Sequence, residues 1–320
     1  MKIWETIVET FEIPEEARPF IEVYLTDTDV KAIELMGAGS YLPEDLFRLL
    51  KPIVEDPQAY TQDAYSRGIF NKTAELGEIG YKVGTFAKCI TYLAQYDPEA
   101  WKKIPAEVRE KIDVWYVNKY AEEAKPRLEE SLRNPSKLIE NAFFYTLEET
   151  LALIDRQEQE EFCVFPCNCK ALALKCEGRK PSNVCLGFHY KSINSDYDRG
   201  HGKLITKEEA KALVRMANKN GLMQTTETEW GICNCCGCCC YPIRSSQQIG
   251  AKGLWPKKIY DIVWDEEACI RCGKCARICN FGAFTQDAEK RISFDREKCW
   301  GCTICMNNCP KGAISIVKAQ

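Results

Sequence analysis

Residues 269–280 read CIRCGKCARICN and residues 299–310 read CWGCTICMNNCP, so both stretches carry cysteines in the spacing C-x2-C-x2-C-x3-C. The same offset of 30 residues superimposes further positions, namely Asp265 on Asp295 and Gly282-Ala283 on Gly312-Ala313. Matches of such distinctive residue types at a single offset indicate an internal duplication. The C-terminal region therefore consists of two copies of one cysteine-rich motif.

This spacing is similar to that of the bacterial two-cluster ferredoxins, in which three cysteines of one run and the fourth of the other hold each [4Fe–4S] cube. The resemblance implies two [4Fe–4S] clusters, one held by Cys269, Cys272, Cys275 and Cys309 and the other by Cys299, Cys302, Cys305 and Cys279. Two zinc sites are the alternative for cysteine quartets in general, but the double x2, x2, x3 run disfavours them.

One position departs from the ferredoxin pattern. The proline that follows the fourth cysteine is present as Pro310, whereas Asn280 takes its place in the first copy. An asparagine adds hydrogen-bonding capacity that proline lacks, so we expect Asn280 to bond near a cluster sulfur and to shift the potential of that cluster.

The middle of the chain is also dense in cysteine, since 19 of the 20 cysteines lie between Cys163 and Cys309. A subset of ten is predicted to bind one or two additional iron–sulfur clusters, with zinc as the alternative: Cys167, Cys169, Cys176, Cys185, Cys233, Cys235, Cys236, Cys238, Cys239 and Cys240. Neighbouring cysteines point in divergent directions, so the segment ICNCCGCCC is expected to pass between two sites. Cys163 is either a ligand or a buried thiol, and Cys89 is predicted to be a buried thiol.

The compartment follows from the N-terminus and the cysteines together. The first sixteen residues contain five glutamates and no apolar core of signal-peptide length, so a cytoplasmic location is expected. No stretch of roughly 18 apolar residues occurs, and direct membrane insertion is therefore not expected. In a reducing compartment, clustered cysteines indicate metal rather than disulfides.

The N-terminal half has a different character. Residues 1–160 hold 19 Lys and Arg against 31 Asp and Glu, a net charge of −12, and show mainly helical periodicity. Short helices followed by a hairpin over residues 68–86 give the element order of a winged helix. The candidate recognition stretch, residues 55–68, contains three acids and one arginine. We therefore expect docking or packing by this part and no nucleic-acid partner.

The predicted fold class is α+β, in three parts. These are a mainly helical, winged-helix-like docking domain over 1–160, an irregular cysteine-rich region over 161–245 and a two-cluster ferredoxin domain over 256–320. A capping box at Thr206–Glu209 predicts one helix in the middle part, and residues 241–258 are predicted to be a linker. The whole chain resembles a group of anaerobe iron–sulfur proteins with a degenerate winged helix, which implies an anaerobic redox setting.

The expected function is electron transfer. The chain is predicted to deliver low-potential electrons to or from a larger redox enzyme or other electron-transfer subunits. A reductase acting at an additional central cluster is the alternative, and a redox-sensing transcriptional regulator is less favoured because of the acidic N-terminal half. No constellation of acid, base or nucleophile is recognisable, so the catalytic residues are unknown and enzymatic activity stays open.

Overall fold

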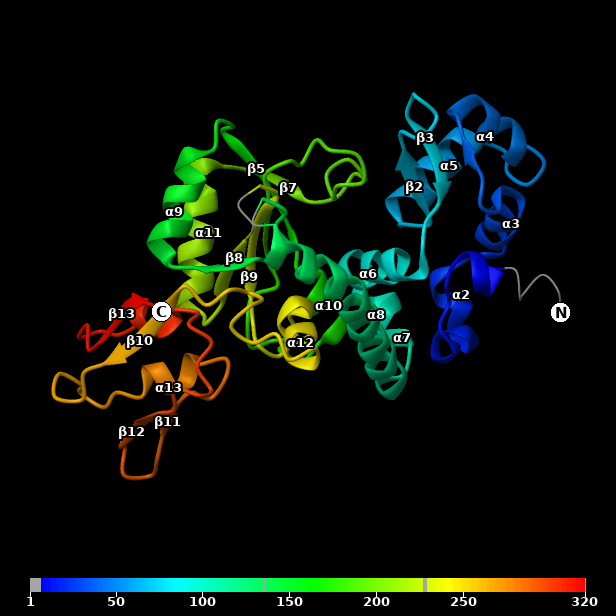
Figure 1. Cartoon of the computed structure of the whole chain (residues 1–320). Helices are drawn as coiled ribbons and strands as arrows, with labels where there is room; N and C mark the ends of the chain where they lie inside the picture. Colours follow the sequence, from blue (N-terminus) through cyan, green and yellow to red (C-terminus); the bar gives the residue numbers. More distant parts are fainter. Residues whose placement is uncertain (1–6, 135, 227–228, 320) are drawn as a thin grey trace. The chain divides into compact units, whose positions relative to one another are not determined.

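A computed structural model describes residues 7–134, 136–226 and 229–319 as a mixed α+β chain (Figure 1). Two compact units emerge. The first comprises residues 1–116, 171–173 and 190–202, and the second comprises residues 117–170, 174–189 and 203–320. The predicted division into three consecutive domains stays a prediction. Within the described ranges, no helix is both long and apolar enough to cross a membrane.

The first unit is mainly helical. Its elements are η1 (Glu15–Phe20), α2 (Ile21–Tyr24), α3 (Asp27–Met36), β1 (Ser40–Tyr41), α4 (Pro43–Leu50), α5 (Pro57–Ser66), β2 (Phe70–Thr73), β3 (Gly80–Val83), α6 (Phe86–Tyr96), α7 (Pro98–Lys103) and the start of α8 (Ala106–Arg133). Strands β1, β3 and β2 form an antiparallel sheet in that order. The expected run of short helices followed by a hairpin is present as α3, α4, α5, β2 and β3, and membership of the winged-helix class stays a prediction.

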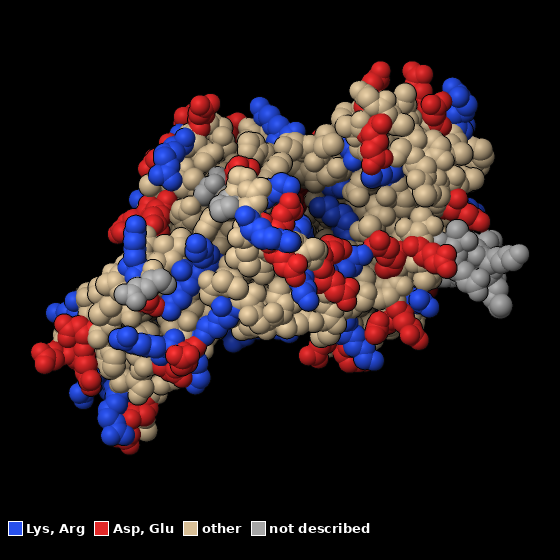
Figure 2. All heavy atoms as spheres, in the orientation of Figure 1, with Lys and Arg blue, Asp and Glu red and all other residues tan. Residues whose placement is uncertain are grey.

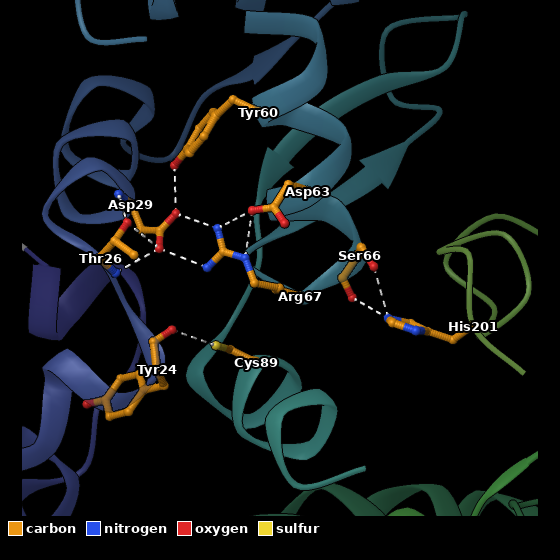
Figure 3. A network of polar contacts seen from close by, with 9 residues as sticks. All are labelled: Tyr24, Thr26, Asp29, Tyr60, Asp63, Ser66, Arg67, Cys89 and His201. Atoms are coloured by element: carbon orange, nitrogen blue, oxygen red, sulfur yellow. Dashed lines mark hydrogen bonds and ion pairs between the residues drawn. The ribbon is translucent and has the colours of Figure 1, made fainter. Parts of the chain in front are cut away.

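A buried carboxylate ties the helices of this unit together (Figure 3). The side chain of Asp29 is fully buried, accepts hydrogen bonds from Thr26 and Tyr60, and forms a bidentate pair with Arg67 at 2.8 and 2.9 Å. Burial alone would raise the pKa of Asp29, but the Arg67 guanidinium outweighs it and the net shift is downward. Cys89 lies below this network and donates to the Tyr24 carbonyl at 3.7 Å, which confirms the predicted buried thiol.

Residues 190–202, although distant in sequence, belong to the first unit because Arg199 anchors them. Its guanidinium is fully buried and donates to the carbonyls of Tyr65 and Phe70 and to the side chains of Asn71 and Asn194. It also lies 4.3 Å from the centroid of the Tyr65 ring. His201, in the same loop, hydrogen-bonds with Ser66 (Figure 3). Its ring also stacks on that of Tyr96, with the ring centroids 3.8 Å apart.

The second unit is built on a six-stranded antiparallel sheet in the order β4-β8-β9-β6-β5-β7. These strands are β4 (Phe143–Tyr145), β5 (Glu161–Pro166), β6 (Asn183–Gly187), β7 (Lys203–Thr206), β8 (Met223–Thr226) and β9 (Gly231–Cys235). Helices α9 (Leu147–Arg156) and α11 (Lys207–Lys219) pack on the sheet through a core that includes Ile154, Phe162 and Val214. The capping box predicted at the start of α11 is confirmed, with Thr206 and Glu209 bonding reciprocally.

The prediction of an irregular region over 161–245 is therefore wrong. The strands are short, and cysteine and asparagine occupy positions where valine or isoleucine would have shown the period of two, as in β9, GICNC. The predicted linker 241–258 is also wrong in part, because residues Tyr241–Gln248 form α12 with Pro242 in its first turn. The remaining helix of this region is α10 (Asn168–Ala173).

The C-terminal part of the second unit repeats one small motif. Strand β10 (Tyr260–Trp264) pairs with β13 (Ile314–Lys318), and β11 (Phe284–Gln286) pairs with β12 (Ile292–Phe294). Helices α13 (Lys274–Ile278) and α14 (Ile304–Asn307) lie in equivalent places of the two copies. Ile262, Phe284 and Ile314 belong to the core that the two copies share. Cys305 lies within this core, and five other repeat cysteines pack against it.

Candidate metal centres

The two predicted ligand sets of the repeat differ in exposure, and we call them the outer set and the inner set. The outer set is Cys269, Cys272, Cys275 and Cys309, and the inner set is Cys279, Cys299, Cys302 and Cys305. Cys272 of the outer set is exposed and its three partners are half-buried, whereas Cys302 and Cys305 of the inner set are buried. One set thus reaches the surface and the other lies deeper.

The neighbours of Cys302 follow the cross-over that the ferredoxin resemblance implies. Burial raises the pKa of Cys302 to about 12, and Cys279 and Cys299 add to the shift because their charges lie close by. Burial likewise raises the pKa of Cys275 to about 11, with further contributions from Cys269 and Cys272. Cys279 therefore lies with the cysteines of the other run. This placement supports the predicted ligand sets, which stay a prediction.

Backbone N–H groups point at sulfurs in both copies. Gly301 N donates to Cys299 Sγ at 3.4 Å, Arg271 N donates to Cys269 Sγ at 3.4 Å, and Ala283 N donates to Cys279 Sγ at 3.2 Å. Such donors stabilise the negative charge of ligated thiolates and tune cluster potentials. The donor set of the C-terminal domain thus fits two [4Fe–4S] clusters.

Four central cysteines form a compact group, which we call the quartet: Cys176, Cys236, Cys238 and Cys239. Its neighbouring sulfurs are 3.5–3.8 Å apart, and all four lie within 4.8 Å of one another. Metal–sulfur bonds of about 2.3 Å place tetrahedral thiolates about 3.8 Å apart, so the quartet has the spacing of a single tetrahedral ion, iron or zinc.

The pKa values of two thiols of the quartet are lowered, and one of these two residues is exposed. Hydrogen bonds from Cys176, Cys238 and Cys239 hold the pKa of Cys236 well below its usual range. The pKa of Cys238 is lowered to about 6, chiefly by Cys176, and this side chain is exposed. The exposed thiol of the quartet is therefore one whose pKa is lowered by its neighbours.

The other six central cysteines lie on β6, on β9 and at the starts of α10 and α12, and we call them the hexad: Cys167, Cys169, Cys240, Cys235, Cys233 and Cys185. Within the hexad, Cys240 Sγ and Cys235 Sγ are 3.4 Å apart, and Tyr241 N donates to Cys169 Sγ at 3.5 Å. Four of the six are buried and two are half-buried. The hexad is wider than the quartet, which is the only compact group of possible ligands among the residues described.

The structure thus redistributes the predicted central ligands. Four cysteines that are neighbours in sequence are divided, because Cys176 lies in the quartet whereas Cys167, Cys169 and Cys185 do not. Neighbours in ICNCCGCCC face different groups, Cys235 the hexad and Cys236 the quartet. Cys163 belongs to neither group and lies buried in β5.

Lys170 is a buried cation beside the central cysteines that the sequence did not reveal. Its side chain is buried and donates to the Asn234 carbonyl at 2.9 Å. Burial alone would lower the pKa of Lys170, but the thiolates of the hexad and of Cys236 raise it above its usual value. The Lys170 ammonium therefore lies near thiols of both central groups. The sequence gives no sign of this, because Lys170 is a single lysine next to the C-x-C segment.

Asn280 has a different role from the one expected. Its side chain accepts from Lys180 Nζ at 2.6 Å and from Gly237 N at 3.2 Å, and it donates to the Gly221 carbonyl at 2.9 Å. These partners belong to the central region, so Asn280 joins the C-terminal repeat to the turn that carries the quartet. The expectation of a bond from this side chain to a cluster sulfur is wrong.

Both central groups adjoin the inner set. A Cβ on Gly237, between the quartet residues Cys236 and Cys238, would lie 2.7 Å from the Asn280 carbonyl oxygen, next in sequence to Cys279. Cys235 and Cys240 of the hexad share one apolar cluster with Cys302 of the inner set.

The comparisons with known proteins concern the C-terminal part alone. Residues 263–316 match the family model of the 4Fe-4S dicluster domain. Pyruvate synthase subunit PorD of Methanocaldococcus jannaschii is 35% identical over 68 residues, which cover 21% of this chain and 77% of that protein. An uncharacterized ferredoxin of the same organism is 39% identical over 59 residues, 18% of this chain and 77% of that protein.

A larger relative contains a similar segment. The archaeal-type glutamate synthase [NADPH] of Thermotoga maritima is 40% identical over 55 residues, 17% of this chain but only 11% of that protein. No solved structure matches the chain. Through its C-terminal repeat, the chain belongs to the family of ferredoxins with a 4Fe-4S dicluster domain.

Proposed function

We propose that the chain is an electron-transfer component in which the ferredoxin domain passes electrons between a larger redox enzyme and the central cysteine-rich region. The observation that carries this proposal is the unequal surroundings of the two ferredoxin sets. The outer set reaches solvent at Cys272, whereas the inner set adjoins the quartet and the hexad. A [4Fe–4S] cluster supplies one-electron chemistry when bound, and the chain orders the two sites into a surface position and an interior one.

A partner would dock beside the outer set. Ile270, between two ligands of that set, is 56% exposed, which leaves an apolar contact next to the outer thiolates. The relatives that share this domain include a subunit of pyruvate synthase and a glutamate synthase, and partnership with a larger low-potential, anaerobic enzyme is our proposal for this chain. We also propose a cytoplasmic location, because the central thiols need a reducing compartment to stay available.

The winged-helix-like part is proposed to dock rather than to read DNA. Within residues 55–68, the single cation Arg67 is held by Asp29 and Asp63, so this stretch offers no free positive charge to phosphate. On the face in view, Figure 2 shows Lys and Arg side chains interspersed with Asp and Glu. A continuous basic stripe, as DNA binding requires, does not occur there.

A second function is favoured by the quartet. Cys238 is exposed and its pKa is lowered to about 6, so a metal ion held there would have a ligand edge open to small molecules. A reductase that receives electrons from the inner ferredoxin cluster and acts at the quartet is therefore the alternative function.

The test is reduction by a protein donor. The anaerobically purified chain should hold at least eight iron, and a reduced small ferredoxin should reduce it through the outer cluster. Cys272→Ser should slow this reduction at least tenfold, while Cys89→Ser, a matched control outside the ferredoxin domain, should leave it unchanged. An unchanged rate in a Cys272→Ser protein that has lost its outer cluster would overturn the relay.

A further inference from the structure

We propose that the quartet binds one thiophilic divalent metal ion, zinc or ferrous iron, through four thiolates and without inorganic sulfide. This inference goes beyond the proposed function, since the ferredoxin relay needs no ion at the quartet. It rests on the positions of the four sulfur atoms and on the two chain segments that carry them. Cys176 lies in the turn after α10, whereas Cys236, Cys238 and Cys239 lie between β9 and α12.

Each sulfur of the quartet has two sulfur neighbours at short distance. Cys176 Sγ lies 3.8 Å from Cys236 Sγ and 3.6 Å from Cys239 Sγ. Cys238 Sγ lies 3.5 Å from Cys236 Sγ and 3.7 Å from Cys239 Sγ. The two remaining pairs of sulfurs are within 4.8 Å. Since thiolates around one tetrahedral ion are about 3.8 Å apart, a single ion bound by all four fits this group.

The same spacing disfavours an iron–sulfur cluster at the quartet. A [4Fe–4S] cube holds each thiolate on a different iron, so its four thiolate sulfurs are further apart than those around one ion. The ferredoxin domain offers a comparison within the same chain. All eight of its cysteines are among the described residues, and no three of them lie within 4.8 Å of one another. The quartet is therefore more compact than the two sets that the family pattern assigns to cubes.

Packing alone does not account for the quartet. A buried cysteine that serves as a small hydrophobe contacts apolar groups, as a valine would, but Cys176, Cys236 and Cys239 are buried against other sulfurs. When a divalent ion binds, the protons of the four thiols pass to solvent, and two thiolate charges remain uncompensated. Because Cys238 is exposed, water can screen part of this charge and lower the cost of holding it.

Four protein ligands fill the coordination of a tetrahedral ion. Zinc sites of this kind are structural, whereas sites that act on a substrate keep one position open. The proposed ion therefore joins two segments of the chain and binds no small molecule. The reductase alternative would require Cys238, the exposed ligand, to leave the ion.

The two segments that carry the quartet also hold the side chain of Asn280. Lys180 N donates to the Cys176 carbonyl at 3.2 Å, and Lys180 Nζ donates to Asn280 Oδ1 at 2.6 Å. From the other segment, Gly237 N donates to the same Asn280 oxygen at 3.2 Å. An ion that joins the segments would fix both donors at once. Because Asn280 follows Cys279, the filling of the quartet would affect the inner set.

The experiment compares the metal and sulfide content per chain of full-length proteins prepared anaerobically. The variants are Cys176→Ala, Cys236→Ala, Cys238→Ala and Cys239→Ala, and the matched control is Cys163→Ala, which removes a buried cysteine outside the quartet. Each quartet variant should lose one zinc or one iron and no sulfide, and the metal that is lost identifies the ion. The control should lose neither. In the quartet variants the potential of the inner cluster should shift, whereas that of the outer cluster should stay constant.

Alkylation of the wild-type chain tests the site without a substitution and so covers a variant that fails to fold. Cys238 is exposed, so a free thiol there would react at once, whereas a ligated thiolate is protected. Mass spectrometry should find all four quartet cysteines unmodified until a chelator removes one metal ion, and all four modified together afterwards.

Four results would overturn the proposal. They are a quartet variant that loses several iron together with sulfide, two quartet variants with the metal content of wild type, immediate alkylation of Cys238, and a disulfide among the four cysteines of the freshly prepared chain. An inner potential that stays unchanged in every variant without the ion would overturn the link through Asn280. Ferredoxin signals and reduction by a small ferredoxin are measured alongside, and their persistence would show that the relay stands independently of the quartet.

Discussion

Replacing Gly237 by alanine tests the contact that joins the central region to the ferredoxin domain. The new Cβ would lie 2.7 Å from the Asn280 carbonyl oxygen, 3.1 Å from Asn280 Cβ and 3.3 Å from a ring carbon of Phe281. The Asn280 oxygen must therefore move by about 0.7 Å to reach the 3.4 Å of an ordinary contact. Since Asn280 follows Cys279, the displacement falls on a ligand of the inner set.

The expected magnitude follows from this displacement. Overpacking costs about 1–3 kcal/mol, and the lower entropy of the unfolded alanine chain offsets about 0.4–1 kcal/mol, so Gly237→Ala should destabilise the second unit by about 1–2 kcal/mol. The potential of the inner cluster should shift, whereas that of the outer cluster should stay constant.

Anaerobic denaturant unfolding and a potentiometric titration followed by electron paramagnetic resonance measure both effects. Gly250→Ala is the control, because a Cβ there has no atom within 4 Å and only the positive φ of 68° adds strain. Equal shifts of both clusters, or a Gly237→Ala protein as stable as wild type with an unchanged inner cluster, would refute the reasoning.

Three further predictions concern single side chains. Cys302→Ser should remove the inner cluster signal before the outer one, and spectroscopy showing the reverse order would contradict the ligand sets. Asp29→Asn should cost the first unit about 2–4 kcal/mol at pH 7, allowing for an Arg67 side chain that is 35% exposed. The pKa of Asp29 is lowered in the folded state, so its carboxylate stabilises the fold at neutral pH and this stabilisation is lost as the pH falls below about 4. The difference in urea midpoint between wild type and Asp29→Asn should therefore become smaller in acid. Lys170→Met should lower the iron content and the reduction potential of the central sites, because it removes a buried positive charge, and Lys170→Arg should stay closer to wild type. A potentiometric titration that is unchanged in both variants would contradict an electrostatic role of the Lys170 ammonium.

The ferredoxin domain was predictable because its ligands are local. A C-x2-C-x2-C loop brings three thiolates together within one turn of chain, so the spacing from Cys269 to Cys275 already indicates the site. The fourth ligand needed the family resemblance, since Cys279 and Cys309 reach their sites only when the two copies pack together. The same holds for the starts of two helices, since α4 begins with Pro43 in its first turn and α11 begins with the capping box at Thr206.

The central groups were not predictable in detail because the β-sheet, and not the spacing along the chain, decides which cysteines lie together. Cys233 and Cys235 face the same way because residues two apart in a strand share a face, and this relation is visible only once β9 is known to be a strand. Cys176 lies in the quartet next to Cys236, which is 60 residues further along the chain. Spacing along the chain therefore grouped Cys176 with Cys167 and Cys185, whereas the pairing of β6 with β9 separates them.

The anchoring of residues 190–202 by Arg199 has a consequence for how the protein is made. The first unit lacks a buried guanidinium for the carbonyls of Tyr65 and Phe70 until residue 199 has left the ribosome, although its helices are complete long before. By then strands β5 and β6 have also emerged, so the thiols of Cys167, Cys169 and Cys185 are already synthesised when the N-terminal unit closes. The N-terminal unit can therefore close before Cys233 to Cys240 have emerged, so the central cysteine groups are completed later in synthesis than that unit, and a gene fragment that ends before residue 190 encodes neither unit in full.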